Sequence, residues 1–503
     1  MRYLPYMLVP AACLVVTGAL WGAYQLRTSK PVATTVAVAS SAAESRRIDD
    51  FMVENLRATG LPGASIVVVR NGAVAHLAGY GATASGAAIT ADTPMALGSI
   101  AKSVTATAVM QLVDAGRIDL DRPLRDYLPE FTTADPRSAR ITVRQLLHQT
   151  SGLADSGFAE MSLPQPADLH EEMLRLRQAR LVAEPGTQWN YHNPNYHLLA
   201  GLIERVSGMP YADYMAANVF ARAGMMHSRM VTTPAQDDAS IEDGHVDRHG
   251  IPTASRALDH FTVGSGSLVS TAADMGRWLS LLLQGGTAPT GERIVSAAAI
   301  AQTREPAPAA AHYGFGWMIG KAPGGGLRLD HGGVLFTYSA NQVLFPDEGL
   351  GFAVLFNDVT PAGREQQSFT DGLVQVLHGE TPATGTPVSV VHGIVLANLT
   401  ILAVALGVRG VARSRRWAFR RMGRSRLLSA LRLAWLLPPI AAAASLPRLL
   451  GALFGGRDVT WLTVWYGWSA LLVFFACLGL AASATLAARS IALLRQSRRL
   501  RRP

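Results

Sequence analysis

The stretch Gly98-Ser99-Ile100-Ala101-Lys102, continued by SVTATAVMQLVDA as far as Ala115, is the most informative part of this 503-residue chain. It contains one of only three lysines, whereas 42 of the 45 basic residues are arginine. Arginine keeps its proton in proteins, so a lysine retained among so many arginines indicates a site that needs an amine able to become neutral. The Ser-x-x-Lys spacing is the one that a serine nucleophile activated by a lysine base requires.

Apolar residues recur at helical spacing after this lysine, at Val104, Ala108, Leu112 and Ala115. The pattern predicts a helix over 99–115, with Gly116 as its end. Ser99 and Lys102 would share a face of its first turn, where the helix dipole disfavours a protonated lysine and favours a developing oxyanion. Burial would lower the pKa of Lys102 further. The alternative is a chance pair, of which about 0.2 are expected in a chain with so few lysines.

The net charge of the chain is split between two parts. From Val388 onward there are 17 arginines and one acidic residue, Asp458, which gives +16. The whole chain carries +9, so residues 1–387, with 28 basic and 35 acidic residues, carry −7. Because the positive excess lies in the tail and is not spread over a folded basic face, the composition argues against a nucleic-acid partner.

The tail contains three apolar segments long enough to span a bilayer, at about 388–408, 427–447 and 461–488. Eight arginines lie between the first and second segments, and six more follow the third. Arginine-rich loops stay in the cytoplasm, so the pattern predicts a multi-pass protein of the cell membrane with residues 29–387 outside. The middle segment contains Arg432 and Pro438-Pro439, and the alternative for it is a re-entrant or interfacial helix.

The rest of the chain divides by composition. Residues 1–28 are apolar after Arg2 and are either a signal peptide or a signal-anchor helix, and both would export the next part of the chain. Residues 29–46 are small and polar and are expected to be a flexible linker. An exported domain is expected at 47–385 and a membrane region at 386–503. The two cysteines, Cys13 and Cys477, fall in the apolar segments, so the exported domain has no disulfide and depends on its core.

Short apolar runs at both ends of the exported domain predict strands, and the region between them is mostly helical. The expected strands are 66–69, 73–77, 313–317, 326–329, 339–345 and 351–356, and the clearest helices are 196–207, 272–283 and 366–377. The predicted fold is α/β (α+β): an antiparallel sheet from both domain ends flanked by helices, plus a helical subdomain, followed by a C-terminal transmembrane helical region.

Two further motifs carry polar chemistry. Tyr191-His192-Asn193 follows a Pro-Gly turn; the tyrosine is suited to relay a proton, and the asparagine to hold a lysine and donate to a substrate amide. His331-Gly332-Gly333 precedes a strand, where glycines let the backbone approach a ligand and a backbone N–H would complete an oxyanion hole. Taken alone, each motif also fits an ordinary turn, with a packed tyrosine in the first and a surface histidine in the second.

Together with Ser99-Ile100-Ala101-Lys102, these motifs resemble, in order, the three motifs of the serine β-lactamase-like, penicillin-binding-protein-like hydrolases. That family includes class C β-lactamases, D-alanyl-D-alanine carboxypeptidases, D-aminopeptidases and related esterases. The stretches at 120–131, 141–153, 184–211 and 268–278 also look like the family, so the resemblance covers about 47–380.

The resemblance implies a role for each site residue. Ser99 would be the nucleophile, Lys102 its base and Tyr191 the acid/base partner. The substrate contacts would come from Asn193, His331, Gly332, Gly333 and Val334. The N–H groups of Ser99 and Val334 would form the oxyanion hole. The resemblance implies no cofactor.

The sequence departs from the family pattern in three places. His148-Gln149 precedes Thr150, where many members place the histidine one position later. The run 334–337 (VLFT) replaces a usually glycine-rich turn, so the lip of the pocket is expected to be bulkier. His331 stands where true β-lactamases commonly have lysine, which favours peptidase or esterase activity over antibiotic hydrolysis.

The sequence thus predicts a membrane-anchored extracytoplasmic serine hydrolase that acts through an acyl-enzyme on D-amino-acid peptides, esters or β-lactam-like substrates. Its partners would be a small-molecule or peptidoglycan-type peptide substrate and the lipid bilayer. The alternative is a non-catalytic cell-wall-binding or regulatory membrane protein that keeps the fold. A zinc site of His148, His192 and His197 is disfavoured, since the chain has no His-Glu-x-x-His helix and no cysteine partner.

Overall fold

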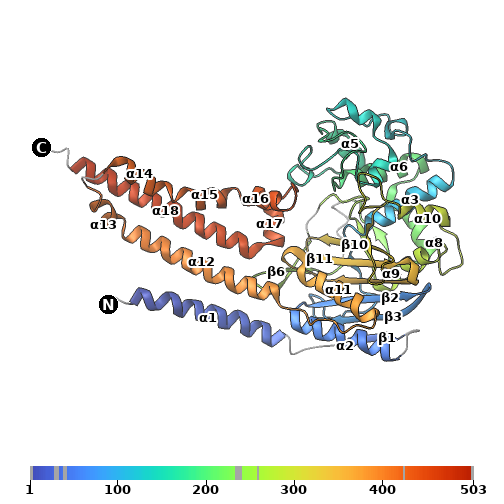
Figure 1. The fold of residues 1–503 in the computed structure, drawn as a ribbon, viewed down its shortest axis with the longest axis horizontal. Helices are drawn as coiled ribbons and strands as arrows, with labels where there is room; N and C mark the ends of the chain where they lie inside the picture. The colour runs from blue at the N-terminus through green and yellow to red at the C-terminus, as the bar shows by residue number, and fades with distance from the viewer. Residues whose placement is uncertain are drawn as a thin grey trace. The chain divides into compact units, whose positions relative to one another are not determined.

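The computed structural model describes residues 4–27, 33–37, 42–232, 241–257, 260–422 and 425–499. The chain divides into two compact units, which Figure 1 shows together. One unit, which we call the hydrolase unit after the activity predicted from its sequence, comprises Thr28–Val246 and Pro252–Thr386. The other, which we call the membrane unit after its predicted spans, comprises Met1–Arg27, Asp247–Ile251 and Pro387–Pro503. Each unit is described by itself.

The hydrolase unit is organised around a seven-stranded antiparallel sheet in the order β1-β3-β2-β12-β11-β10-β9. The strands are β1 Ala33–Ala37, β2 Gly63–Arg70, β3 Ala73–Gly81, β9 Met318–Lys321, β10 Leu327–Leu335, β11 Tyr338–Phe345 and β12 Leu350–Phe356. The two ends of the domain meet where β2 pairs with β12, with Ile66 opposite Val354. This confirms the prediction of one antiparallel sheet built from both ends.

Alternate residues of the central strands face two separate cores, as the two-residue period of a strand requires. Ile66 and Val68 belong to a core that is completed by helices α2 (Ala42–Thr59) and α11 (Arg364–Leu377). Val67 and Val69 belong to the other, larger core, which contains helices α3 (Ala101–Asp114) and α9 (Ala272–Leu283). The sheet is therefore covered by helices on both faces.

A helical subdomain, drawn in cyan and green in Figure 1, lies between the strands in the sequence. Its helices are α4 Val143–Leu147, α5 Leu169–Leu176, α6 Pro194–Ser207, α7 Tyr211–Met215, α8 Ala221–Ala223 and α10 Ala297–Thr303. Side chains fix several of the helix starts: Thr142 and Gln145 form a capping box at α4, and Asp168 caps α5. These caps satisfy backbone N–H groups that a helix start leaves unpaired.

Two small sheets join the subdomain to the rest of the unit. One has the order β4-β8-β5 and the other β13-β6-β7. Their strands are β4 Met95–Ala96, β5 Arg229–Met230, β6 Gly244–Asp247, β7 Pro252–Ser255, β8 Leu268–Ser270 and β13 Asp358–Val359. Next to the β4–β8 pair, Gly98 forms a bridge with Ser267, which brings the segments that precede α3 and β8 together.

The sequence-based elements differ from the observed ones in three places. Residues 313–317 form no strand; they turn before β9, and Gly316 adopts a positive φ of 76°. The stretch 29–46, expected to be a linker, contains β1 and the first turn of α2. Helix α2 extends to Ala42 because its buried stripe already includes Ser45 and Ile48. Helix α3 begins at Ala101, so Ser99 lies just before it.

The membrane unit consists of helices. They are α1 Leu4–Arg27, α12 Val388–Ala412, α13 Ser414–Phe419, α14 Arg426–Ala434, α15 Leu437–Ala444, α16 Leu446–Leu453, α17 Trp461–Gly467 and α18 Ser469–Arg499. Within the described residues, four stretches are long and apolar enough to cross a membrane: Val9–Leu26, Val388–Ala412, Arg426–Ala444 and Ser469–Ser497. The middle segment expected at 427–447 is divided into short helices, because prolines begin α15 and α16.

The long helices α12 and α18 run side by side and pack through small residues (Figure 1). A Cβ added to Gly407 would lie 2.5 Å from that of Ala481, and one added to Gly410 would lie 2.5 Å from Thr485 Oγ1. Such glycines let two apolar helices approach closely, as in membrane helix pairs.

Candidate active site

Lys102 is fully buried in the first turn of α3, beside Ser99. Its Nζ donates hydrogen bonds to three oxygens: Ser99 Oγ at 3.1 Å, Asn193 Oδ1 at 2.9 Å and Ser265 O at 2.8 Å. Each of the three comes from a different segment of the hydrolase unit. The predicted pair of Ser99 and Lys102 is therefore in hydrogen-bonding contact, and Asn193 joins it as expected.

The identity of these acceptors determines where the lone pair of a neutral Lys102 points. An amide oxygen and a backbone carbonyl can only accept hydrogen bonds, so Asn193 Oδ1 and Ser265 O must each take an N–H. A neutral amine has only two N–H bonds, and its remaining tetrahedral position then faces Ser99 Oγ. The contact between Nζ and Ser99 Oγ is the one that the predicted role of Lys102 as the base of Ser99 requires.

Asn193 is held in this orientation by a buried acid. Its Nδ2 donates to Glu160 Oε1 at 2.6 Å, which leaves Oδ1 for the lysine. Burial raises the pKa of Glu160, against the opposing effect of the neighbouring His197 and His192. An amide that flipped would place its NH₂ group against the lysine, so Glu160 fixes the polarity of the contact.

A second set of buried side chains is connected to the lysine through Ser265. His197 Nε2 lies 3.0 Å from Ser265 Oγ, and its Nδ1 lies 2.9 Å from Glu172 Oε1. Among the described residues, Glu160, Glu172 and His197 are the group whose potential ligand atoms come within 4.8 Å of one another. Because hydrogen bonds already engage these side chains, we interpret the group as a hydrogen-bonded network behind the site.

The three histidines considered from sequence as zinc ligands have separate partners. His192 Nδ1 lies 2.7 Å from Asp155 Oδ1, whereas His197 bonds Glu172 and Ser265. His148 Nδ1 lies 3.3 Å from Tyr313 O, and burial lowers the pKa of His148 to about 4. His148 therefore supports the segment that carries Tyr313.

Tyr191 lies over the lysine, with Nζ 4.7 Å from its ring centroid. Gln149 fixes the backbone on both sides of it: Gln149 O accepts from Asn190 N at 2.9 Å, and Oε1 accepts from His192 N at 3.1 Å. To do so, Gln149 adopts a positive φ of 60°. The departure from the family pattern at 148–149 thus has a structural use, since Gln149 holds the Tyr191 segment in place.

Aromatic rings line the site around Tyr191. Its centroid lies 6.3 Å from that of Trp189, 6.4 Å from that of Tyr313 and 6.1 Å from that of His331. Burial and the nearby charge of Lys102 lower the pKa of His331 to about 4, so this histidine is neutral near pH 7. Its Nδ1 lies 2.7 Å from Gly332 O, an acceptor, and therefore carries the hydrogen. Nε2 then accepts from the Tyr313 hydroxyl at 3.4 Å.

Two glycines, Gly333 of the third motif and Gly98 just before Ser99, permit a close approach of backbones. A Cβ on Gly333 would collide with the Leu97 carbonyl and lie 3.0 Å from Ser99 N. A Cβ on Gly98 would lie 2.7 Å from Val334 N. The backbones that carry the Ser99 and Val334 amides therefore run against each other, which is the arrangement that the predicted oxyanion hole needs.

The β10–β11 turn beside this contact is bulky, as the sequence suggests. Phe336 has a positive φ of 48°, a conformation that glycine adopts without strain. The Val334 side chain is 58% exposed at the turn. Bulk and backbone strain thus occur together at the position where the family usually has glycines.

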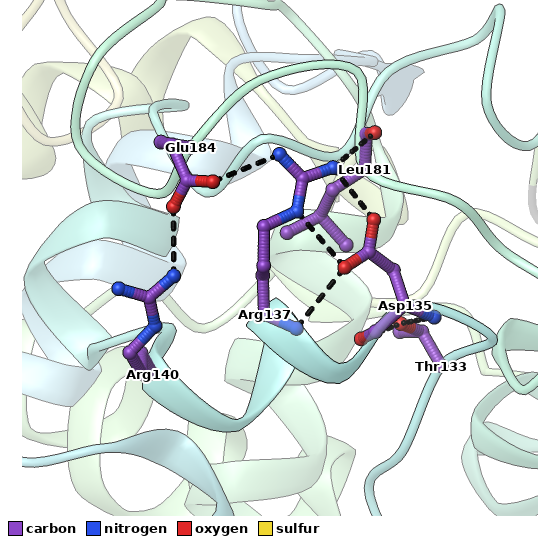
Figure 2. A network of polar contacts seen from close by, with 6 residues as sticks. All are labelled: Thr133, Asp135, Arg137, Arg140, Leu181 and Glu184. Atoms are coloured by element: carbon purple, nitrogen blue, oxygen red, sulfur yellow. Dashed lines mark hydrogen bonds and ion pairs between the residues drawn. The ribbon is translucent and has the colours of Figure 1, made fainter.

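A surface ion-pair network fixes the segment that leads to Tyr191 (Figure 2). Arg137 donates to both oxygens of Asp135, at 2.9 and 2.6 Å, and to Glu184 Oε1 at 3.0 Å. Arg140 donates to the other oxygen of Glu184 at 2.7 Å. The hydrogen bonds from Arg137 lower the pKa of Asp135 to about 2. Glu184 begins the Pro-Gly turn that precedes Tyr191, so the network anchors one end of that segment.

With the fold and this geometry in place, comparison with known families assigns the class. The Beta-lactamase family model matches residues 47–375, and the chain belongs to that family of serine hydrolases. Its relatives include penicillin-binding proteins and D-aminopeptidases. This confirms the family predicted from the three motifs.

Particular relatives show how far the similarity extends. Penicillin-binding protein 4 of Amycolatopsis lactamdurans is 30% identical over 349 residues, which cover 65% of this chain and 87% of the relative. The D-aminopeptidase of Brucella canis is 29% identical over 308 residues, 59% of this chain but only 56% of the relative. The octameric penicillin-binding protein homologue from Pyrococcus abyssi has a TM-score of 0.59 at 25% identity, covering 70% of this chain and 81% of that one. A D-stereospecific amidohydrolase from Streptomyces sp. shares the fold, with a TM-score of 0.51 at 24% identity, covering 62% and 94%.

Proposed function

We propose that this protein is a membrane-anchored serine hydrolase in which Ser99 forms an acyl-enzyme. The observation that carries the proposal is the contact of Lys102 Nζ with Ser99 Oγ, beside two oxygens that can only accept N–H groups. This arrangement supports a neutral amine whose lone pair is available to the serine proton. A lysine with only a structural role would not need two neighbours that can only accept hydrogen bonds and that leave the third direction of its amine to a serine. The alternative of a non-catalytic protein that keeps the fold gives no reason for this arrangement.

The proposed reaction has two steps. Lys102 takes the Ser99 proton as Oγ attacks the substrate carbonyl, and the N–H groups of Ser99 and Val334 stabilise the resulting oxyanion. Tyr191, above the lysine, passes the proton to the leaving amine or alcohol, which departs to give the acyl-enzyme. Water, deprotonated by the same pair, then attacks the ester carbonyl and releases the acid, so Ser99 regains its proton.

For the substrate we propose an amide or ester next to a D-amino acid. Relatives named D-aminopeptidase and D-stereospecific amidohydrolase support this class. His331, neutral near pH 7, adds no positive charge for the carboxylate of a β-lactam. The bulky turn with Phe336 and the exposed Val334 would also narrow the lip of the substrate pocket. We therefore expect a D-amino-acid amide or a p-nitrophenyl ester to have a higher kcat/KM than nitrocefin.

Covalent labelling of Ser99 tests the proposal directly. A fluorescent fluorophosphonate or penicillin should label the wild-type protein, and Ser99→Ala should lose the label and hydrolysis of p-nitrophenyl esters. Ser156→Ala is the matched control, since Ser156 is exposed on the same unit and outside the site. Turnover by Ser99→Ala within about tenfold of wild type would exclude Ser99 as the nucleophile, because losing a nucleophile costs several orders of magnitude.

We also propose that the hydrolase unit faces away from the cytoplasm. The support is the sequence charge split and the four apolar stretches long enough to span a membrane. Alkaline phosphatase fused after residue 385 should be active, and the same fusion after residue 420 should be inactive. Activity of the second fusion would reverse the orientation.

A further inference from the structure

The membrane unit contains a hollow lined by cations, between α13 and the C-terminal part of α18. Its volume is about 740 Å³. Four arginines line it, all with exposed side chains: Arg415, Arg416, Arg420 and Arg495. We call this feature the arginine groove. Its size is within the range of sites that hold a small molecule or a headgroup.

No protein carboxylate neutralises the arginine groove within the described residues. None of its four arginines has an ion pair with a described acidic side chain. From Val388 to the end, the sequence contains a single acid, Asp458, which lies in the loop before α17. Four guanidinium groups around one hollow repel one another, so an anion from outside the chain would be strongly favoured there.

The groove also lies where apolar helices end. Helix α13 follows directly after the candidate span Val388–Ala412, and Arg495 is near the end of the candidate span Ser469–Ser497. The groove includes two exposed apolar side chains, Phe419 (64%) and Ile491 (48%). A site at this depth presents cations at the headgroup level and apolar side chains toward the acyl chains.

The shape of the groove is held by packing between its walls. Two guanidinium groups lie over the ring of Trp417 in α13: that of Arg421 lies 4.8 Å from the ring centroid, and that of Arg489, on α18, lies 5.0 Å from it. Such contacts fix α13 against α18. At the groove, Gln496 Oε1 is shut off from solvent and accepts no hydrogen bond within the described part of the chain.

We propose that the arginine groove binds the headgroup of an anionic phospholipid, with phosphatidylglycerol as the fitting example. Guanidinium groups grip a phosphate through paired N–H donors, and a basic pocket at the end of membrane helices is the usual place for such a headgroup. The proposal rests on the membrane anchoring proposed above and is independent of the hydrolase activity.

The test measures lipid binding by the full chain in detergent. Native mass spectrometry should show retention of phosphatidylglycerol but not of phosphatidylcholine. The variant Arg416→Gln/Arg420→Gln/Arg495→Gln should bind phosphatidylglycerol on the order of 100-fold more weakly, since each basic residue near an anionic surface contributes about fivefold. The control Arg426→Gln/Arg432→Gln/Arg448→Gln removes the same charge outside the groove and should change binding less than about threefold.

Three results would overturn the proposal. Equal losses in both triple variants would show a diffuse charge effect without a site. Equal retention of phosphatidylcholine would show no preference for an anionic headgroup. Displacement of the lipid by millimolar inorganic phosphate would identify the groove as a site for the free anion.

A fourth variant covers the case in which removing arginines disturbs insertion. Arg416→Lys/Arg420→Lys/Arg495→Lys keeps every positive charge and should keep the topology reported by the alkaline phosphatase fusions. It should still bind phosphatidylglycerol more weakly than wild type, by about tenfold, because lysine cannot form the paired contacts. Wild-type affinity in this variant would mean that charge alone is responsible.

Discussion

The arginines of the two units differ in whether carboxylates pair with them. In the hydrolase unit, arginines such as Arg144 and Arg175 lie within 2.7 Å of carboxylates. In the membrane unit, the four arginines of the groove have no ion pair with a described acid. Paired arginines add stability and local order, whereas unpaired ones remain available to bind an anion from outside.

Lys102 belongs to neither pattern. It is fully buried, and the three oxygens that accept from its Nζ belong to a hydroxyl, an amide and a backbone carbonyl. Neutral acceptors stabilise an ammonium less than a carboxylate does, so they leave the neutral amine accessible. Changes at these three kinds of cation should therefore have effects of very different size, from the loss of catalysis to a barely measurable change in stability.

Lys102→Arg should abolish hydrolysis almost as completely as Lys102→Ala, with a loss of about 10⁴-fold or more in kcat/KM. The substitution keeps the charge, but a guanidinium cannot accept a proton near neutral pH. The matched control is Lys321→Arg, at the exposed end of β9, which should retain wild-type activity. An active Lys102→Arg enzyme would show that Lys102 acts only as a fixed charge or donor.

Glu160→Leu should lower kcat by about 10- to 100-fold, the usual range for a group that orients a catalytic neighbour. Without Glu160 the Asn193 amide is free to flip and to present its NH₂ group to Lys102. Glu160→Gln is the matched control, because its side-chain oxygen still accepts from Asn193 Nδ2. It should keep most of the activity.

The pH profile separates positioning from a merely structural role for Glu160. In Glu160→Leu, the acid limb of the pH profile of kcat should move, because the orientation of the Asn193 amide determines how well it stabilises a charged Lys102. A loss of kcat with an unchanged profile and a lower thermal midpoint would mean that the residue only supports the fold. Equal losses in the Leu and Gln variants would also contradict the positioning role.

The sequence predicts the acid-base pair well and its supports poorly, for a physical reason. Ser99 and Lys102 are three residues apart, so local geometry alone brings them together. Asn193 and Ser265 reach the lysine from 91 and 163 residues away, and the sequence contains no local signal for that distance. The Tyr191-His192-Asn193 motif suggested Asn193 as a partner for a lysine, and the family resemblance connected it with Lys102. No motif marks Ser265 in the sequence; the available signal is that glycines flank it, in Gly264-Ser265-Gly266.

The same reasoning explains which parts of the fold were predictable. Strands β2 and β12 are continuous buried apolar runs, and helix α9 repeats its apolar residues at helical spacing. Their predicted bounds fall within a few residues of the observed ones. Residues 313–317 are as apolar as a strand, but glycines at 314 and 316 allow a turn against α3 and Thr303. A Cβ on Gly316 would lie 2.6 Å from Ser103 N, a tertiary constraint that local propensity cannot reveal.

Arg137→Gln should lower the thermal midpoint of the hydrolase unit by about 2–4 °C, since it removes the centre of the network in Figure 2. The effect depends on pH with a definite sign. The folded-state pKa of Asp135 is lowered from 3.8 to about 2, and hydrogen bonding to Arg137 also lowers the pKa of Glu184 from 4.5, so the network's contribution is complete above about pH 5. It is lost as the pH falls toward 2, and the difference between wild type and variant should shrink over that window. A difference that stayed constant from pH 5 to pH 2 would show that Asp135 does not carry it.

The smallest effect is expected for Arg122→Gln, which removes the Arg122–Asp126 pair. The two atoms lie 3.0 Å apart, the same distance as between Arg137 and Glu184, but the side chains are 54% and 40% exposed. Water screens such a pair, and ordering two long side chains offsets the attraction that remains. We expect a change in thermal midpoint below about 1 °C at 0.15 M salt, and unchanged hydrolysis.

Thermal midpoints of Arg137→Gln and Arg122→Gln measured at 0.02 M and 0.5 M salt complete the comparison. The Arg137→Gln deficit should persist at high salt, because two carboxylates and the Leu181 carbonyl hold that guanidinium in place. Equal deficits in the two variants would mean that distance alone sets the contribution of an arginine, and the distinction between paired and exposed cations in this unit would fail.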